Sequence, residues 1–162
     1  LYLCLTAKRK DSMSGDTDLI KLYSGQILAL AADMPRTERL EAPHATVKKR
    51  SPLCGSTITV DICVKDGVIS DYGQDVKACA LGQAAASVVG AHVIGRSREE
   101  IEAARDALKA MLTSGGPAPA APFDELKVLL PARDFKNRHA SILLSLEATL
   151  EAMDLADQTA CA

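Results

Sequence analysis

The sequence predicts an α+β fold in which a small antiparallel sheet of about three strands packs against several helices. Residues 57–65 alternate between apolar side chains and others, which is typical of a half-buried strand. Asp66-Gly67 follows at once and residues 68–74 return, so this stretch predicts a β-hairpin. Segments on both sides repeat apolar residues at helical spacing. With 162 residues, 48% of them hydrophobic, the chain can bury the core of one domain.

The segment before the hairpin contains a helix and a basic stretch. Apolar residues recur at helical spacing over residues 18–32, which predicts the first helix. Met34-Pro35-Arg36 ends it, because proline disfavours helical backbone in the residue before it. Residues 39–50 include the run Lys48-Lys49-Arg50 and are interpreted as a solvated strand or loop, since such runs are common on protein surfaces.

The segment after the hairpin predicts the remaining helices. Ser97 and Glu100 have the spacing of a capping box, which marks the start of one helix, and Gly95 ends the helix before it. Residues 113–122 form a Pro- and Gly-containing linker too short to separate two domains. The expected spans are residues 76–94, a helix from position 98, residues 123–130 up to Pro131, and a last helix from Asp134 or Asn137 to about Ala156.

Charge and composition exclude two classes of partner. The net charge is −2 and aromatic residues make up 3% with no Trp, so neither a nucleic acid nor an anionic membrane is expected to bind. Five cysteines, at positions 4, 54, 63, 79 and 161, occur without a secretory signal, which favours a reducing compartment and a cytoplasmic protein. Residues 1–12 are interpreted as an N-terminal extension or cloning remnant, because Met13 offers a more natural start, and residues 13–162 as the single domain.

Two cysteines stand at the two ends of the hairpin unit. Cys54 follows Pro52, which restricts the backbone, and precedes Gly55, which permits a positive φ, so it lies in a tight loop before the first hairpin strand. Cys79 lies in the first turn of the helix that follows the second strand. If these elements fold back on one another the two sulfur atoms meet, which suits a metal or cluster site. Cys63 alternates away from the core-facing residues and is interpreted as a small packing residue.

His139 is the histidine that best complements the two thiols. It lies at the N-terminal end of the last helix, on the apolar stripe of that helix. A helix N-terminus disfavours the imidazolium ion, so the ring is expected to stay neutral and able to bind a metal. A histidine on an apolar face is more often a core residue, but the two thiols favour the ligand role here.

These residues occur in segments that resemble a known family. The segments are Met34-Pro35-Arg36, Ser51-Pro52-Leu53-Cys54-Gly55, Lys77-Ala78-Cys79-Ala80-Leu81-Gly82, Pro131-Ala132-Arg133 and His139-Ala140-Ser141. With them the chain, over about residues 19–153, resembles the iron–sulfur cluster scaffold family of IscU, SufU and the N-terminal domain of NifU. It departs from the family pattern at Ser56, where the family has Asp, and at Ala140, where the family has a third cysteine.

The resemblance implies an IscU-like fold and a protein that is not an enzyme. Its function would be to hold a transient iron–sulfur cluster, of the [2Fe–2S] type, and to pass it to apo-proteins. The implied ligands are Cys54, Cys79 and His139, and the candidates for a fourth ligand or a neighbouring group are Ser56, His44 and His92. The implied partners are a cysteine desulfurase and apo iron–sulfur proteins, with the chain itself a monomer or weak homo-oligomer.

Two other functions remain open. The first is a zinc-binding, SufU-like sulfur acceptor or a divergent paralogue, because an altered ligand set can retain zinc after losing cluster assembly. The second is a thiol enzyme with Cys54 or Cys79 as nucleophile and His139 as base. The enzyme is the less favoured of the two, since the sequence offers no recognisable third group to orient the histidine.

Overall fold

One antiparallel sheet of three strands forms the base of the molecule. The computed structural model describes residues 23–160, so the interpretation of residues 1–12 and the first part of the helix expected over residues 18–32 lie outside it. The strands are β1 (Ala45–Arg50), β2 (Thr57–Lys65) and β3 (Val68–Lys77), in the order β1-β2-β3. The predicted hairpin is confirmed: Asp66 and Gly67 both have positive φ, at 56° and 79°, as a two-residue turn of this kind requires.

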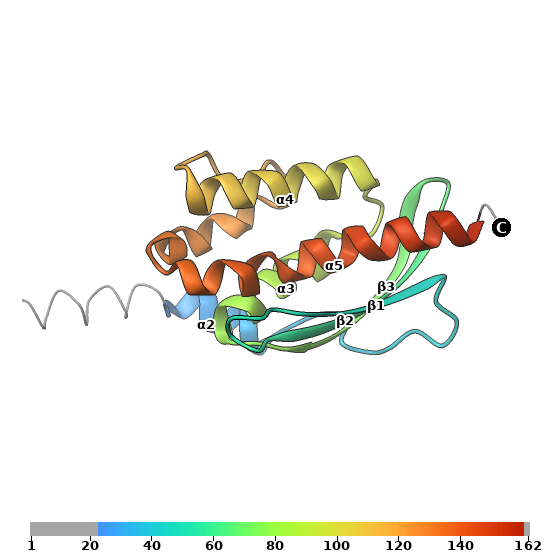
Figure 1. Cartoon of the computed structure of the whole chain (residues 1–162), viewed down its shortest axis with the longest axis horizontal. Coiled ribbons are helices and arrows are strands. Elements are labelled where there is room, and N and C mark those ends of the chain that lie inside the picture. The colour runs from blue at the N-terminus through green and yellow to red at the C-terminus, as the bar shows by residue number, and fades with distance from the viewer. Residues whose placement is uncertain (1–22, 161–162) are drawn as a thin grey trace, which may run out of the picture.

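The helices are α2 (Gly25–Ala32), α3 (Ala80–His92), α4 (Arg98–Thr113), the 3-10 helix η1 (Asp124–Asp134) and α5 (Lys136–Ala160). In Figure 1 the sheet is the lower layer, α3 and α5 lie above it, and α4 lies on top of them. Alternate residues of the strands, such as Val47, Ile58, Val60 and Ile62, are buried in the core beneath the helices. The predicted α+β architecture is therefore confirmed in the described residues.

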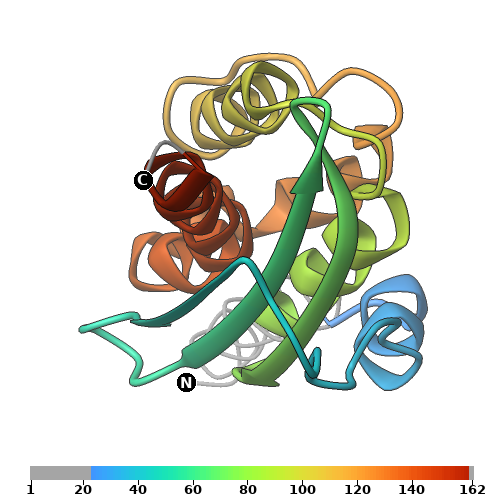
Figure 2. The same cartoon turned by 90° about the vertical axis from the view of Figure 1, so that its right-hand side faces the viewer.

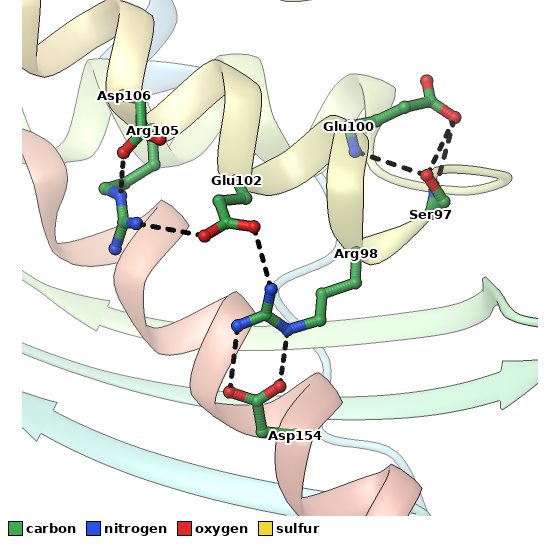
Figure 3. A network of polar contacts seen from close by, with 7 residues as sticks. All are labelled: Ser97, Arg98, Glu100, Glu102, Arg105, Asp106 and Asp154. Atoms are coloured by element: carbon green, nitrogen blue, oxygen red, sulfur yellow. Dashed lines mark hydrogen bonds and ion pairs between the residues drawn. The ribbon is translucent and has the colours of Figure 1, made fainter.

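The predicted capping box starts α4. Ser97 Oγ accepts a hydrogen bond from the Glu100 backbone N–H at 3.3 Å, and the Ser97 N–H donates to Glu100 Oε1 at 3.4 Å. The next residue, Arg98, donates through Nε and Nη2 to both carboxylate oxygens of Asp154, on α5 (Figure 3). This bidentate pair fixes the start of α4 against the distal half of α5.

Residues 36–42, here called the strap, cross the outer face of the sheet, the face opposite to the helices (Figure 2). The buried carboxylate of Asp61 on β2 accepts hydrogen bonds from Arg39 Nε at 2.6 Å and from the Leu40 N–H at 3.1 Å. Gly73 on β3 lies directly beneath the strap: a Cβ atom at this position would be 2.3 Å from the backbone oxygen of Glu38. The strap therefore depends on a buried carboxylate and on the absence of a side chain at position 73.

Several element boundaries differ from the predictions. β3 runs on to Lys77, and α3 begins at Ala80 instead of position 76, because Val76 and Lys77 pair with β2. α2 begins only at Gly25, where the Ser24 hydroxyl caps the helix by accepting from the Ile27 N–H. The short helix expected over residues 123–130 is a 3-10 helix that continues through Pro131.

Within the described residues, no helix is both long enough and apolar enough to cross a membrane.

Candidate functional site

Cys54 lies in a closed loop between β1 and β2. The Ser51 N–H donates to the Ser56 carbonyl at 2.8 Å, and the Gly55 N–H donates to the Ser51 carbonyl at 3.0 Å. Gly55 has a φ of 69°, so it supplies the left-handed backbone that the sequence predicts. These bonds hold the half-buried Cys54 thiol over the end of the sheet.

Cys79 lies at the same end of the sheet. Thr57, the first residue of β2, pairs with Arg50 at the end of β1 and with Lys77 at the end of β3. The loops that carry Cys54 and Cys79 therefore leave neighbouring strand ends. Cys79 has extended backbone and is the N-cap residue of α3, one position before the helical turn in which the sequence places it.

Ser141 on α5 links the two thiols. Its Oγ is 3.6 Å from Cys79 Sγ and 2.9 Å from Ser56 Oγ, and Ser56 Oγ is in turn 3.3 Å from Cys54 Sγ. The Ser51 hydroxyl is also 3.3 Å from Cys54 Sγ. Ser51, Ser56 and Ser141 are all buried. Cys54 and Cys79 thus belong to one hydrogen-bonded cluster, which we call the thiol–hydroxyl cluster (Ser51, Cys54, Ser56, Cys79 and Ser141).

The hydroxyl groups of this cluster change the acidity of Cys54. Burial raises the pKa of its thiol, because burial disfavours a charged group. Hydrogen bonds from Ser51, from the hydroxyl and backbone N–H of Ser56, and from Ser141 stabilise the thiolate and lower the pKa by more. The net result is a pKa of about 7, below that of an ordinary thiol. Near neutral pH a large fraction of Cys54 is therefore the thiolate, the form that binds metals and attacks electrophiles.

The metal-free protein is expected to show this low pKa in its alkylation by iodoacetamide. Because the thiolate is the reactive form, the rate at Cys54 should rise with pH and reach half its plateau near pH 7. Ser141→Ala removes one hydroxyl donor and should move this midpoint to higher pH. Peptide mass spectrometry, which resolves each cysteine, measures both curves. Ser145→Ala removes another buried hydroxyl of α5 and serves as the control. An unshifted midpoint in Ser141→Ala would contradict the assigned role of Ser141.

His139 lies in another environment in this structure. Its Nε2 is 3.0 Å from the Ala132 carbonyl and 3.1 Å from the Arg133 carbonyl. Both partners are acceptors, so Nε2 carries a hydrogen and only Nδ1 has a lone pair free for a metal. The residue is 9% exposed and lines a cavity of about 620 Å³ together with Lys136 and Thr113. His139 thus does not lie in the thiol–hydroxyl cluster.

The other two histidines lie away from Cys54 and Cys79. His44 precedes β1, and its Nδ1 accepts a hydrogen bond from the Val64 N–H at 3.0 Å, near the hairpin end of β2. His92 is in the last turn of α3 and packs edge-on against Phe123, with ring centroids 6.5 Å apart. Cys79 caps the opposite end of that helix, roughly 20 Å away for its 13 residues. Of the candidates for a fourth group, only Ser56 lies beside a thiol.

Across residues 23–160, no three His, Cys, Asp or Glu side chains converge closely enough to hold a metal ion. The arrangement offers two soft sulfur ligands, each half-buried, surrounded by neutral hydroxyl groups. Cys63 is on the outer face of the sheet, as its alternation predicts, with its Sγ 3.6 Å from the Ala42 carbonyl. It does not belong to the site.

Sequence reasoning missed the roles of Ser51 and Ser141. Each lies inside a segment that carries the family resemblance, at a position where the family pattern has no ligand. The available signal was the clustering of hydroxyl residues next to the cysteines, at positions 51, 56 and 141.

Solved structures that share this fold include the three that follow. The N-terminal part of a nitrogen-fixing NifU-like protein from Brucella abortus has a TM-score of 0.84 and 42% identity, covering 87% of this chain and 98% of that chain. A SufU protein from the thermophile Fervidobacterium islandicum AW-1 has a TM-score of 0.73 and 18% identity, covering 83% of this chain and 98% of its own. Its name gives it a suggested role as iron–sulfur cluster assembly scaffold for the SUF system. A protein described as hypothetical has a TM-score of 0.71 and 22% identity, with 83% and 98% covered.

The last two likenesses show the fold alone, because their identities are low. No protein-family model matches the chain, and no curated protein shows significant similarity to it. The Brucella domain, by contrast, is similar in sequence to this chain over nearly the whole length of the Brucella domain. The chain belongs to the family of NifU-like N-terminal domains.

Proposed function

We propose that the chain is a scaffold or carrier in iron–sulfur cluster assembly. Iron and sulfide are its cargo, and the thiolates of Cys54 and Cys79 bind them. The observation that carries the proposal is the meeting of these two cysteines in one hydrogen-bonded cluster, within a chain of the NifU-like family. Thiolates are the usual ligands of iron–sulfur clusters. Both cysteines are half-buried, which agrees with a cargo that must be taken up and released.

The hydroxyl groups around Cys54 favour the uptake step. A metal binds the thiolate and not the thiol, so binding at neutral pH normally requires the release of a proton. With a pKa of about 7, a large fraction of Cys54 is already deprotonated at neutral pH, so metal binding has less of a proton to displace. The same hydroxyls can donate to a sulfur atom that carries negative charge from the cargo, because hydrogen bonds to ligand sulfurs tune such centres.

His139 is the third proposed ligand, and its participation requires a structural change. Its free lone pair is on Nδ1, because Nε2 donates to the carbonyls of Ala132 and Arg133. A metal-bound histidine commonly donates its other N–H to a backbone carbonyl, so these bonds are compatible with binding through Nδ1. In the described residues His139 does not lie close enough to Cys54 and Cys79 to share a metal ion with them. The first turn of α5, which carries His139, would therefore have to move toward the two thiols on binding.

A zinc-binding sulfur acceptor is the second candidate function. The observation that favours it is the loss of two stronger ligands: Ser56, which contacts the Cys54 thiol, stands where the family has Asp, and Ala140 stands where the family has a third cysteine. Two thiolates and an imidazole suit tetrahedral zinc with an open fourth position. A thiol enzyme has less support, because the hydrogen-bond partners of the two thiols in the described residues are hydroxyl and backbone groups rather than an imidazole base.

Metal analysis of protein purified without oxygen tests the proposal. Iron, zinc and acid-labile sulfide are measured, and ultraviolet–visible spectra are recorded before and after incubation with ferrous iron, cysteine, a cysteine desulfurase and excess dithiothreitol, which reduces the persulfide sulfur to sulfide. A scaffold should gain iron and sulfide in equal amounts, with visible charge-transfer bands, and should lose them to an apo-ferredoxin. Zinc alone, with no cluster after incubation, would favour the second function. Neither metal, in a folded sample, would overturn both.

A further inference from the structure

The basic run of the sequence is divided between two faces of the sheet. Successive strand residues point to opposite faces. Lys49 therefore points to the helical side, where its Nζ is 3.2 Å from Glu151 Oε2 on α5. Lys48 and Arg50 lie on the outer face and are exposed. One lysine of the run thus forms an ion pair with α5, and its two neighbours face solvent.

The strand register adds a third cation to these two. Arg50, Thr57 and Lys77 form the row of outer-face residues nearest to the thiols, and Lys48 and Asp75 flank Thr59 in the next row. The strap covers the row after that, through Asp61 and Gly73. The part of the outer face that residues 23–160 leave uncovered is therefore a small basic surface, which we call the basic face (Lys48, Arg50, Thr57, Thr59, Asp75 and Lys77).

In the described part of the chain, the three cations of the basic face form no ion pairs with neighbouring carboxylates. None of Lys48, Arg50 and Lys77 forms an ion pair within residues 23–160, whereas Lys49 does. Asp75 is the one carboxylate on the face, and its charge also acts on Arg39 of the strap. The three cations gather here although the chain as a whole carries a net charge of −2.

The basic face borders the thiols and an exposed apolar side chain. Arg50 and Lys77 are the last residues of the two strands that lead into the Cys54 and Cys79 loops. Leu53, directly before Cys54, is 73% exposed, the largest exposure among the described large hydrophobic residues that face solvent. An apolar side chain bordered by polar and charged residues matches the apolar centre and polar rim of a protein-docking surface.

We propose that the basic face and Leu53 form the docking surface for an acidic surface patch of the protein that delivers sulfur to the thiols. This inference rests on the proposed function, which makes that protein a cysteine desulfurase. Opposite charges attract the two proteins and set their orientation, and Leu53 gives a short-range apolar contact beside Cys54. The arrangement brings the partner's sulfur to the end of the sheet where both thiols lie.

Binding of the purified desulfurase from the same organism tests this surface. The double variant Lys48→Glu/Lys77→Glu reverses two charges of the basic face and leaves both cysteines and Arg50 in place. The matched control is Lys65→Glu/Lys109→Glu, which changes the net charge equally at two exposed lysines outside this face. At low salt the first variant should raise Kd by about tenfold or more, mainly through slower association, and the difference should shrink at high salt. The control should bind like the unsubstituted chain.

The outcomes separate this inference from the proposed function. Equal binding by the two variants would overturn the basic face as the docking surface while leaving the scaffold function intact. Failure of the unsubstituted chain to bind the desulfurase, with cluster loading from chemical sulfide preserved, would also overturn this inference alone. Absence of metal and cluster from the unsubstituted chain would count against the proposed function. Binding to phosphatidylserine vesicles, lost on reversal of the same charges, would assign the face to a membrane instead.

Discussion

Cys54→Ala is expected to lower the affinity for iron or zinc by about a hundredfold and to leave the domain folded. The chain offers two thiolates at the site, so this change halves the soft ligands. Structural zinc sites gain about 10–16 kcal/mol from typically four ligands. One ligand is therefore worth roughly 3 kcal/mol, which is about a hundredfold in affinity. The fold should persist because Cys54 lies in a loop that backbone bonds between Ser51 and Ser56 close.

Cys63→Ala provides the matched control for this experiment. Cys63 has the same chemistry and a similar partial burial, but it lies on the outer face of the sheet with its Sγ near the Ala42 carbonyl. Metal content after anaerobic purification and competition with a chelator give the two affinities, and circular dichroism reports the fold. Equal metal content in the two variants, both folded, would show that Cys54 is not a ligand.

The sequence predicts the hairpin and the capping box because both signals are local. Asp66-Gly67 demands a particular backbone, and Ser97 and Glu100 satisfy each other's backbone groups within one turn. The meeting of Cys54 and Cys79 was also predictable, since a hairpin returns the chain to the end of the sheet from which it left. These features depend on neighbours in sequence or on a single reversal of the chain.

The rotation of the last helix about its own axis, which decides the direction of each side chain, was not predictable in this way. His139 and Ser141 are two residues apart, which places them about 200° apart around a helix. Only one of them can face the thiols, and periodicity identifies a buried stripe without showing which neighbour each side meets. Here both residues are buried: Ser141 contacts Cys79, and His139 contacts the carbonyls of η1. Packing of α5 between the sheet and η1 decides this, and it involves residues far apart in sequence.

The strap is a second feature that pattern analysis does not reveal. It has no regular secondary structure, and its attachment depends on a buried carboxylate at a position where strand alternation alone predicts an exposed side chain. Burial raises the pKa of Asp61, but hydrogen bonds from Arg39 and Thr46 lower it by more, so this carboxylate stays ionised at neutral pH. An aspartate in an alternating strand is normally taken as solvent-facing, and only the tertiary structure shows what covers it.

Gly73→Ala is expected to lower the free energy of unfolding, because the strap leaves no room for a methyl group. The added Cβ would lie 2.3 Å from the Glu38 backbone oxygen, with the Leu40 nitrogen 3.4 Å away, and backbone cannot rotate aside as a side chain can. The strap would have to lift, which strains its bonds to Asp61 and to the Gln74 N–H, the latter 2.9 Å from the Arg36 carbonyl. Overpacking at the severe end costs about 3 kcal/mol, which for a domain of this size lowers Tm by roughly 10 °C.

Gly25→Ala is the matched control, and it separates the effect of space from the effect of replacing a glycine. Gly25 is the first residue of α2, and a Cβ there would meet nothing within 4 Å. An alanine at a compatible helical position stabilises by about 0.4–1 kcal/mol, since it restricts the unfolded chain. Thermal unfolding followed by circular dichroism should therefore give Tm changes of opposite sign for the two variants. A Tm for Gly73→Ala equal to that of the unsubstituted chain would mean that the strap does not pack closely against β3 at position 73.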